Sequence, residues 1–153
     1  MLITKSSGYA IRAVLALNNE VPNRFVPLKE LAENLDIPYH QFAKVAQKLV
    51  AANLLTSLTG PTGGVHLSKA PENISLMDII FAVEGRGFTD RCLLGLEGCD
   101  ADNPCSLHSY WAPVKDALVD LFHSKSLADL TNPGDNISTV KNKYRAPEKE
   151  NNR

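Results

Sequence analysis

The sequence predicts a mainly α-helical protein with one small β-hairpin, and two patterns along the chain carry this prediction. Apolar residues recur at helical spacing in five separate stretches. Between the third and fourth stretches, two short apolar runs flank a glycine-rich turn, which is the pattern of a hairpin. The chain has 153 residues, of which 44% are hydrophobic, so we expect one packed domain with an appended segment.

A helix-turn-helix is expected in the first third of the chain. Apolar residues at relative positions 0, 3, 4 and 7 predict a first helix from Lys5 to Asn19. The same spacing predicts a second helix over residues 28–35 and a third over residues 39–52. Pro38 separates the last two, because the residue before a proline is biased away from the helical conformation. Two short helices joined by a brief break, with a supporting helix before them, form a helix-turn-helix.

A β-hairpin is expected to follow directly. Residues 54–59 and 65–67 are the predicted strands, and Gly60–Gly64 is the tight loop between them. A helix-turn-helix followed by a hairpin is a winged helix, whose last helix enters the major groove of DNA. Residues 1–69 are therefore predicted to be a winged helix-turn-helix DNA-binding domain.

Residues 70–130 are predicted to hold a long loop and a long C-terminal helix. Ser75 has the position of an N-cap and Asp78 that of its capping-box partner, so a fourth helix begins there. From Glu84 to Pro104 the chain shows no periodic apolar pattern, and a loop of this length is typical of functional segments. The apolar stripe that follows predicts the last helix, although Pro113 indicates a kink or a later start.

Charge is distributed unevenly along the chain, although the formal net charge is only −1. Residues 1–69 carry a net charge of +3, residues 70–135 carry −7, and residues 136–153 carry +3. A basic first half fits an anionic partner such as DNA, and an acidic second half does not. We expect residues 131–153, with their prolines and mixed charges, to be a flexible tail.

The cysteine count indicates the compartment. Only three cysteines are present, they lie within 14 residues, and an odd number does not suit a disulfide scaffold. The chain has no run of 18 apolar residues and no signal-peptide pattern at its start. We therefore expect a cytoplasmic protein without membrane association, whose thiols stay reduced and serve metal or redox chemistry.

The strongest functional signal is the series Cys92, Cys99, Cys105 and His108. Three thiolates and one imidazole from one loop can supply four ligands to a metal centre. The gaps between the cysteines are wider than those of zinc knuckles, which favours a bulkier iron–sulfur cluster. Structural zinc and a metal-free thiol switch are the alternatives, and the leucines at 93, 94 and 96 also fit ordinary core packing.

These features resemble a known family, the IscR/NsrR-type winged-helix transcription regulators of bacteria, from Met1 to about Leu130. The segments that carry the resemblance, besides the three cysteines, are Leu2–Lys5, Gly8–Ala13, Val26–Leu28, Asn53–Leu55 and Gly60–Gly64. The resemblance implies a homodimer that associates through the C-terminal helix and binds a pseudo-palindromic operator in double-stranded DNA. It also implies an iron–sulfur cluster that sets operator affinity in response to iron, redox state or nitric oxide.

Within the family, the ligand set is similar to that of the IscR branch, whose three cysteines and one histidine hold a [2Fe–2S] cluster. In the nitric-oxide-sensing branch an acidic residue near the N-terminus completes a [4Fe–4S] site, and the residue at that position here is Gly8, which cannot ligate. The resemblance thus favours [2Fe–2S] over [4Fe–4S]. Because the loop is expected to be exposed, we also expect that protein purified in air can lack its cluster. The six-residue gap after Cys92 and the wing residue Thr59 depart from the IscR branch, so we expect a different operator.

The candidate DNA-binding residues lie mainly on the third helix and the hairpin. Opposite the apolar face of that helix are Gln41, Lys44, Gln47 and Lys48. Such side chains donate hydrogen bonds to phosphates and base edges, although ordinary solvated positions look the same. With the positions that the resemblance adds, the candidates are Lys5, Tyr39, His40, Gln41, Lys44, Lys48, Thr59, Gly60 and Gly63.

The sequence thus predicts a DNA-binding transcription regulator that is not an enzyme, with residues 70–130 as its cluster-binding loop and dimerisation helix. Two alternatives stay open: a metal-free thiol redox switch, and a protein-interaction module that contains zinc. A thiol–disulfide enzyme is disfavoured because the chain lacks a C-x-x-C motif.

Overall fold

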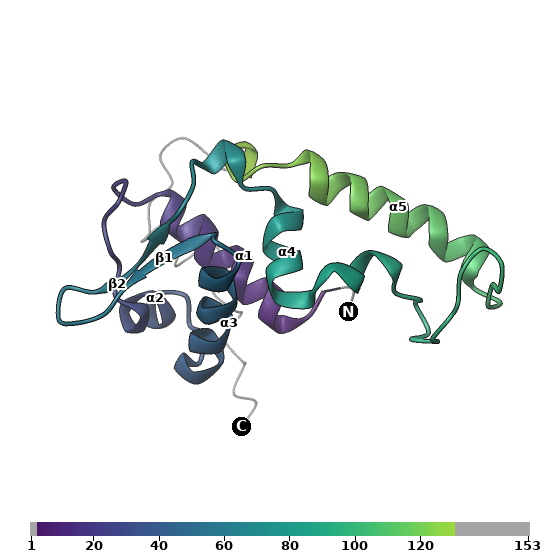
Figure 1. Ribbon diagram of the computed structural model, residues 1–153, viewed down its shortest axis with the longest axis horizontal. Coiled ribbons are helices and arrows are strands. Elements are labelled where there is room, and N and C mark those ends of the chain that lie inside the picture. Colours follow the sequence, from purple (N-terminus) through teal and green to yellow (C-terminus); the bar gives the residue numbers. More distant parts are fainter. Residues whose placement is uncertain (1–2, 131–153) are drawn as a thin grey trace, which may run out of the picture.

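The structure is a computed structural model that describes residues 3–130. Within this range the chain forms five α-helices, three short 3₁₀ helices and one two-stranded hairpin. Figure 1 shows a helical body with the hairpin at one end, while α5 and the loop before it extend from the other end. The predicted fold class, mainly helical with a small hairpin, is confirmed. The flexible tail predicted at 131–153 lies outside the described residues.

Three helices build the body of the molecule where the apolar spacing predicts them. They are α1 (Lys5–Asn18), α2 (Leu28–Asn34) and α3 (Tyr39–Ala51). Thr4 caps α1, because its side-chain oxygen accepts a hydrogen bond from the backbone N–H of Ser7 at 3.3 Å. The turn between α2 and α3 brings the two helices into contact, so the helix-turn-helix is present.

One hydrophobic core holds these helices together. Phe42 and Leu49 of α3 are fully buried, and they pack in one cluster with Val14 of α1 and Leu31 of α2. Each is a position that the helical spacing predicts to be apolar and inward. Because this face of α3 is fixed by packing, its opposite face is held rigidly toward solvent.

The hairpin is formed by β1 (Leu55–Leu58) and β2 (Gly64–Leu67), which pair antiparallel. A contact that the sequence did not indicate fastens it to the body. Val26, just before α2, and Val65 exchange two backbone hydrogen bonds of 2.9 Å, so β2 is tied near the hairpin turn to the segment that leads into α2. Gly64 permits this approach, since a Cβ atom there would lie 2.1 Å from the Val26 carbonyl oxygen.

The fourth helix, α4 (Leu76–Glu84), begins as predicted. Ser75 accepts a hydrogen bond from the backbone of Asp78 at 3.0 Å, and the Asp78 carboxylate accepts one from the backbone of Ser75 at 2.9 Å. After α4 the chain forms a 3₁₀ helix over Arg86–Asp90, a segment for which the sequence predicts only loop.

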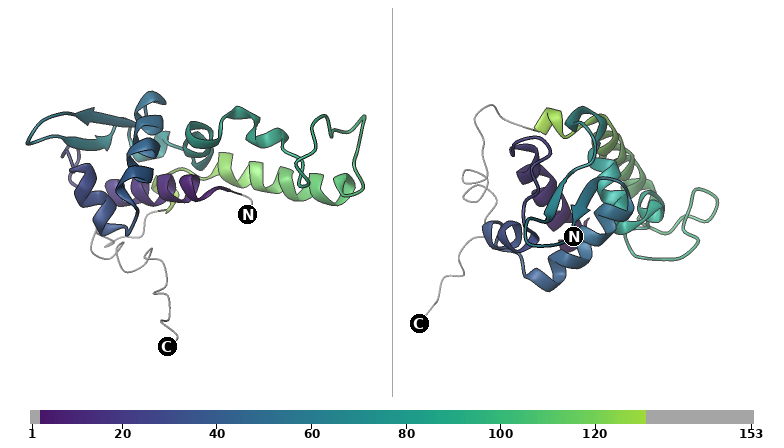
Figure 2. Two further views of the ribbon diagram at one scale, coloured as in Figure 1. Left: turned by 90° about the horizontal axis from the view of Figure 1, so that it is seen from below. Right: turned by 60° about the vertical axis from the view of Figure 1, so that its left-hand side comes forward.

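The last helix, α5 (His108–Ser124), continues through Pro113 without a break and begins five residues before it, so the later start predicted there is wrong. Figure 2 shows it extending along the same side of the molecule as the loop that precedes it. Among the described residues, no side chain of α5 is buried, and Tyr110 is 76% exposed. None of the helices between residues 3 and 130 combines the length and apolarity needed to cross a bilayer.

Candidate functional site

The three cysteines lie together at the end of the molecule remote from the hairpin. Their sulfur atoms are all within 4.8 Å of one another, and the sulfurs of Cys92 and Cys105 are 3.8 Å apart. All three thiols are free and partly buried. Residues 13 positions apart in the chain are thus folded into one group of soft donors, the arrangement that the sequence predicts.

His108 lies beside this group, at the first residue of α5. Its Nδ1 atom is 3.6 Å from the sulfur of Cys99, and its backbone N–H donates to the carbonyl of Cys105 at 3.0 Å. The helix therefore begins immediately after the last cysteine and holds the imidazole next to the thiols. All four candidate ligands are brought together by one loop and the start of one helix.

Turns in the loop bring the thiols close. Gly95 and Gly98 have φ values of 71° and 69°, a left-handed conformation that glycine adopts without steric cost. Farther on, the Asp100 carboxylate accepts backbone hydrogen bonds from Asp102 and Asn103 at 2.9 and 2.8 Å. These turns direct the cysteines inward and the loop leucines outward: Leu93, Leu94 and Leu96 are each 52% exposed, so core packing does not explain them.

The thiols differ in their electrostatic surroundings. The backbone amide of Leu96 lowers the pKa of Cys92 to about 7, against the opposing effect of burial. The backbone amide of Cys105 donates to the Cys99 sulfur at 3.4 Å and lowers the pKa of Cys99. Burial and the neighbouring thiols outweigh that hydrogen bond, so the pKa of Cys99 is raised overall.

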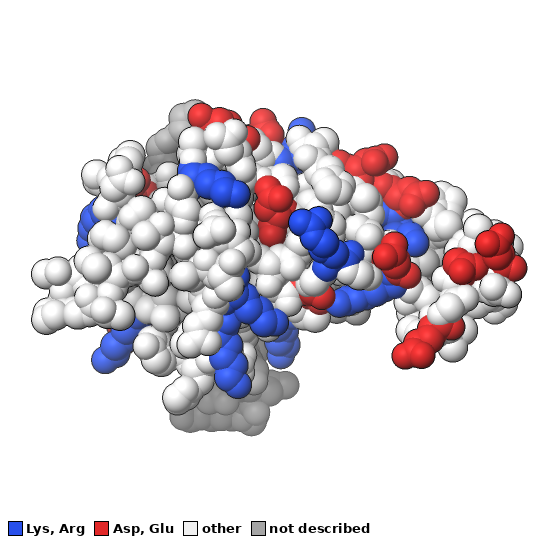
Figure 3. Space-filling view, in the orientation of Figure 1, with Lys and Arg blue, Asp and Glu red and all other residues white. Residues whose placement is uncertain are grey.

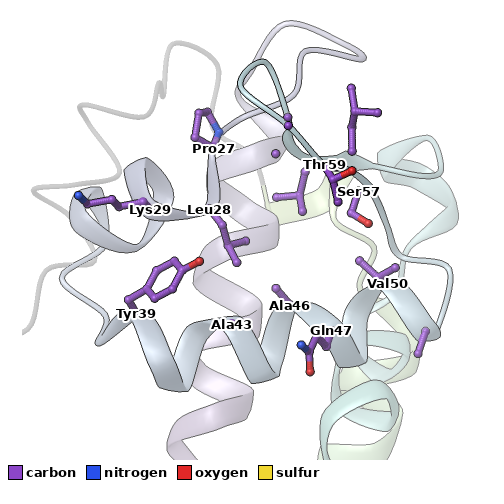
Figure 4. Close-up of a pocket in the computed structure, with 16 residues that line it drawn as sticks. Pro27, Leu28, Lys29, Tyr39, Ala43, Ala46, Gln47, Val50, Ser57 and Thr59 are labelled. Carbon is purple, nitrogen blue, oxygen red and sulfur yellow. The ribbon is translucent and has the colours of Figure 1, made fainter.

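A groove of about 670 Å³ separates α2, α3 and the hairpin (Figure 4). Of the predicted DNA-binding residues, Tyr39, Thr59, Gly60 and Gly63 line it. Its remaining lining residues include Ala43 and Ala46 of α3 and Lys29 of α2, which are not predicted contacts, and Gln47 of α3, which the helical spacing places outward with Lys44. Helical spacing from Tyr39 identifies this face of α3, because residues four and eight positions on lie above it.

The other predicted DNA-binding residues lie elsewhere. His40, Gln41 and Lys44 are exposed on α3 beside the groove. The ammonium of Lys48 donates to the carbonyl of Val83 on α4 at 3.0 Å, so the structure gives this lysine a partner within the protein. Lys5 is exposed at the start of α1, between Thr4 and Ser7, which bond Glu84 at the end of α4.

The two ends of the molecule differ in surface charge, as Figure 3 shows. Acidic side chains gather toward the cysteine loop and α5, whereas the hairpin end carries few charges of either sign. Asp90, Glu97, Asp100 and Asp102 all belong to the loop region. An acidic surface repels DNA phosphates, so this end of the molecule is unsuited to DNA contact.

One buried carboxylate connects the two ends. The side chain of Glu84, the last residue of α4, is only 4% exposed. Burial raises its pKa, but hydrogen bonds from Thr4, Ser7 and Arg91 outweigh burial and lower the pKa of Glu84 from 4.5 to about 2.

This shift predicts an acid-sensitive contribution to stability. The carboxylate of Glu84 stabilises the fold fully above pH 4.5, and its contribution is lost as the pH falls from 4.5 through 2, because the unfolded chain then binds the proton more readily. Urea unfolding at pH 6, 4 and 3 should show that the free energy of unfolding falls less with decreasing pH in Glu84→Gln than in wild type. Glu33→Gln, at an exposed carboxylate on α2, is the control and should follow wild type. Parallel curves for all three proteins would contradict the assignment.

Comparisons with known proteins agree with this architecture. A family model named Rrf2 and described as an iron-dependent transcriptional regulator matches residues 3–133. A helix-turn-helix transcriptional regulator of Aquifex aeolicus is 35% identical over 136 residues, which cover 86% of this chain and 92% of that protein. IscR of Photorhabdus laumondii is 30% identical over 132 residues, covering 86% of this chain and 80% of its own.

Solved structures show the same fold. The chain matches IscR of T. potens with a TM-score of 0.65 and 25% identity, covering 84% of each chain. It matches CymR, the global cysteine regulator of B. subtilis, with a TM-score of 0.68 and 24% identity over 84% of this chain and 94% of that one. The second likeness shows the fold alone. On the family match and the identity to its relatives, the chain belongs to the Rrf2 family of transcriptional regulators.

Proposed function

We propose that this chain is a cytoplasmic DNA-binding regulator whose operator affinity is set by an iron–sulfur cluster bound at Cys92, Cys99, Cys105 and His108. The observation that carries the proposal is the group of three free thiols within 4.8 Å of one another, with an imidazole 3.6 Å from one of them. Iron, redox state or nitric oxide would be the signal.

The donor set fits such a cluster. Thiolate is the ligand that iron–sulfur clusters use, and histidine replaces cysteine on iron in some of them. Four donors from a single chain suffice for a [2Fe–2S] cluster, which we propose in preference to [4Fe–4S]. When bound, the cluster would supply an oxidisable iron centre. The residues of the chain would do the rest: the thiols hold the loop together, and His108 ties it to α5.

Reading of DNA is proposed for the groove face of α3. Gln47 is exposed on this face, and a glutamine amide can hydrogen-bond both N6 and N7 of adenine in the major groove. Ala43 presents a methyl group one turn earlier, which suits contact with the methyl group of thymine. Thr59 and Gly60 at the hairpin would lie on the neighbouring sugar–phosphate backbone.

A homodimer is proposed for α5. Tyr110, Val114 and Leu121 are large apolar side chains that α5 exposes, at 76%, 49% and 45% respectively. A second copy of α5 packed against them would remove them from water and place two copies of α3 about a two-fold axis. Two reading helices related in this way match a pseudo-palindromic operator in double-stranded DNA.

A metal-free thiol switch is the second candidate, and one distance favours it. The sulfurs of Cys92 and Cys105 are 3.8 Å apart, so a small movement would allow a disulfide between them. Such a switch would use the same loop without iron.

The deciding experiment is the visible spectrum, with iron and sulfide analysis, of protein purified without oxygen. Visible bands with equal iron and sulfide would support the cluster, and about two irons per chain would favour [2Fe–2S]. Colourless protein that contains zinc would overturn the sensing function. Colourless protein without metal, in which oxidation changes DNA affinity, would establish the thiol switch instead.

Lys44 and Lys48 should differ in their effect on DNA binding. Lys44 is exposed on α3, whereas the Lys48 ammonium is bonded to Val83. We expect Lys44→Ala to weaken binding to a duplex selected by the wild-type protein from a random-sequence library, and to reduce the salt slope by about 1. Lys48→Ala should reduce the slope less, and Lys125→Ala, exposed just after α5, should leave it unchanged. Fluorescence anisotropy at four salt concentrations measures the slopes. Equal slopes for wild type and Lys44→Ala would exclude a phosphate contact by Lys44.

A further inference from the structure

The C-terminal end of α4 is a junction between the cysteine loop and the DNA-binding helices. At its last residue, the Glu84 carboxylate places its two oxygens in different directions. Oε1 accepts hydrogen bonds from the backbone N–H of Thr4 at 3.0 Å and from the hydroxyl of Ser7 at 2.7 Å. Oε2 accepts a hydrogen bond from Nη1 of Arg91 at 2.9 Å and so forms an ion pair with that arginine. One buried side chain therefore joins the start of α1 to the start of the cysteine loop.

Arg91 extends the junction to the cysteines and to α5. It directly precedes Cys92, and its second guanidinium nitrogen donates to the backbone carbonyl of Glu84 at 3.2 Å. Its own carbonyl accepts a hydrogen bond from the indole of Trp111 on α5 at 3.1 Å. The position of the first cysteine is thus fixed from both sides, by α4 and by α5.

Helix α3, the proposed DNA-reading or recognition helix, reaches the same junction from the other face. The ammonium of Lys48, on α3, donates to the carbonyl of Val83, the residue immediately before Glu84. Helices α3 and α4 are also in contact, as are α1 and α4. Any displacement of the end of α4 therefore changes contacts of both α1 and α3.

A buried carboxylate cannot lose a partner cheaply, because an unpaired charge away from water is costly. If the loop moves Arg91, either the 2.9 Å bond to Glu84 breaks or Glu84 moves with it. The second course shifts the end of α4, since a helix moves as a rigid element. We propose that Glu84 is a positioning residue that couples the arrangement of the cysteine loop to α1 and to the recognition helix α3. This inference rests on the proposed function, in which ligation fixes that loop.

Amide hydrogen exchange tests the coupling without an operator sequence. Wild-type protein purified anaerobically would be compared with the same protein after removal of iron by a chelator. We expect removal to speed exchange in the cysteine loop and, by about fivefold or more, in α1 and α3. In Glu84→Gln, iron content and the change in the loop should persist, while α1 and α3 should exchange alike in both forms. In a glutamine amide only the oxygen accepts hydrogen bonds, because the NH2 group donates, so it cannot accept from both the α1 donors and Arg91 as a carboxylate does.

Three further variants make the result specific. Glu84→Asp keeps the carboxylate and should restore part of the difference in α1 and α3. Glu33→Gln removes an exposed carboxylate of α2 and should behave as wild type. If Glu84→Gln does not fold, Arg91→Lys replaces it, because a lysine ammonium lacks the rigid fork through which two guanidinium nitrogens bond Oε2 and the carbonyl of Glu84.

The outcomes separate the two proposals. Wild-type protein that takes up no iron and sulfide overturns the proposed function and this inference with it. Iron-loaded wild type whose α1 and α3 exchange is unaffected by iron removal overturns the coupling and leaves the cluster in place. A full iron-dependent difference in α1 and α3 of Glu84→Gln also overturns it.

Discussion

Cys99→Ser is expected to abolish the visible chromophore of anaerobically purified protein and to reduce its iron and sulfide to trace levels. The Cys99 sulfur accepts a hydrogen bond from the backbone N–H of Cys105 at 3.4 Å. The Nδ1 atom of His108 is 3.6 Å from the same sulfur. A serine hydroxyl is a hard, weakly acidic donor and a poor substitute for thiolate on iron. Because Cys99 is outside the hydrophobic core, helix content measured by circular dichroism should stay at the wild-type value.

Two histidines of the same helix provide the matched comparison. His108→Ala should shift the visible bands or hasten iron loss, whereas His123→Ala, in the last turn of α5, should leave the spectrum unchanged. Retention of the full absorption by Cys99→Ser would remove that residue from the ligand set. If His108→Ala and His123→Ala both keep the wild-type spectrum, His108 would be excluded from the ligand set.

Gly64→Ala is expected to lower the free energy of unfolding by about 3 kcal/mol or more, and to abolish specific DNA binding. At Gly64 a Cβ atom would lie 2.1 Å from the Val26 carbonyl oxygen, and φ is +150°, where side chains are strained. The atoms in conflict are backbone, so the pairing of Val26 with Val65 must open. Urea unfolding followed by circular dichroism measures the loss.

Gly87→Ala is the control for this substitution. Nothing lies within 4 Å of a Cβ atom built at Gly87, and its φ is not in the left-handed region, so stability should stay within about 0.5 kcal/mol of wild type. A Gly64→Ala protein that unfolds at the wild-type urea concentration would show that the hairpin can detach from the body without cost.

Most of the fold could be predicted because local sequence patterns determine where its helices and strands begin and end. The apolar spacing that places Phe42 and Leu49 inward also places α3, and Ser75 with Asp78 gives the start of α4. The pairing of Val26 with Val65 joins residues 39 apart, and no local pattern marks such a contact. Pro113 was a misleading signal, since a proline in the second turn of a helix removes only one hydrogen bond.

The cysteine group and the groove beside α3 also differ in how far the sequence predicts them. The cysteine group could be predicted from spacing because one loop supplies every donor. The groove could not be predicted, because its shape depends on how α2, α3 and the hairpin meet. The sequence places Gln47 outward on α3, but only the fold shows that it lines the groove. Likewise, the sequence marks Lys48 as a surface cation, but only tertiary packing shows that its ammonium reaches Val83.

The exposed state of α5 has a consequence for how such a protein would respond to its own abundance. Helix α5 contacts α4 but has no fully buried side chain of its own, so in the proposed dimer it should gain part of its order from a second copy. His108 is the first residue of that helix. By mass action, dilution would then loosen the imidazole's position, and cofactor retention would rise with protein concentration. In the proposed regulator, the number of protein copies in the cell would therefore affect cluster retention in addition to the chemical signal.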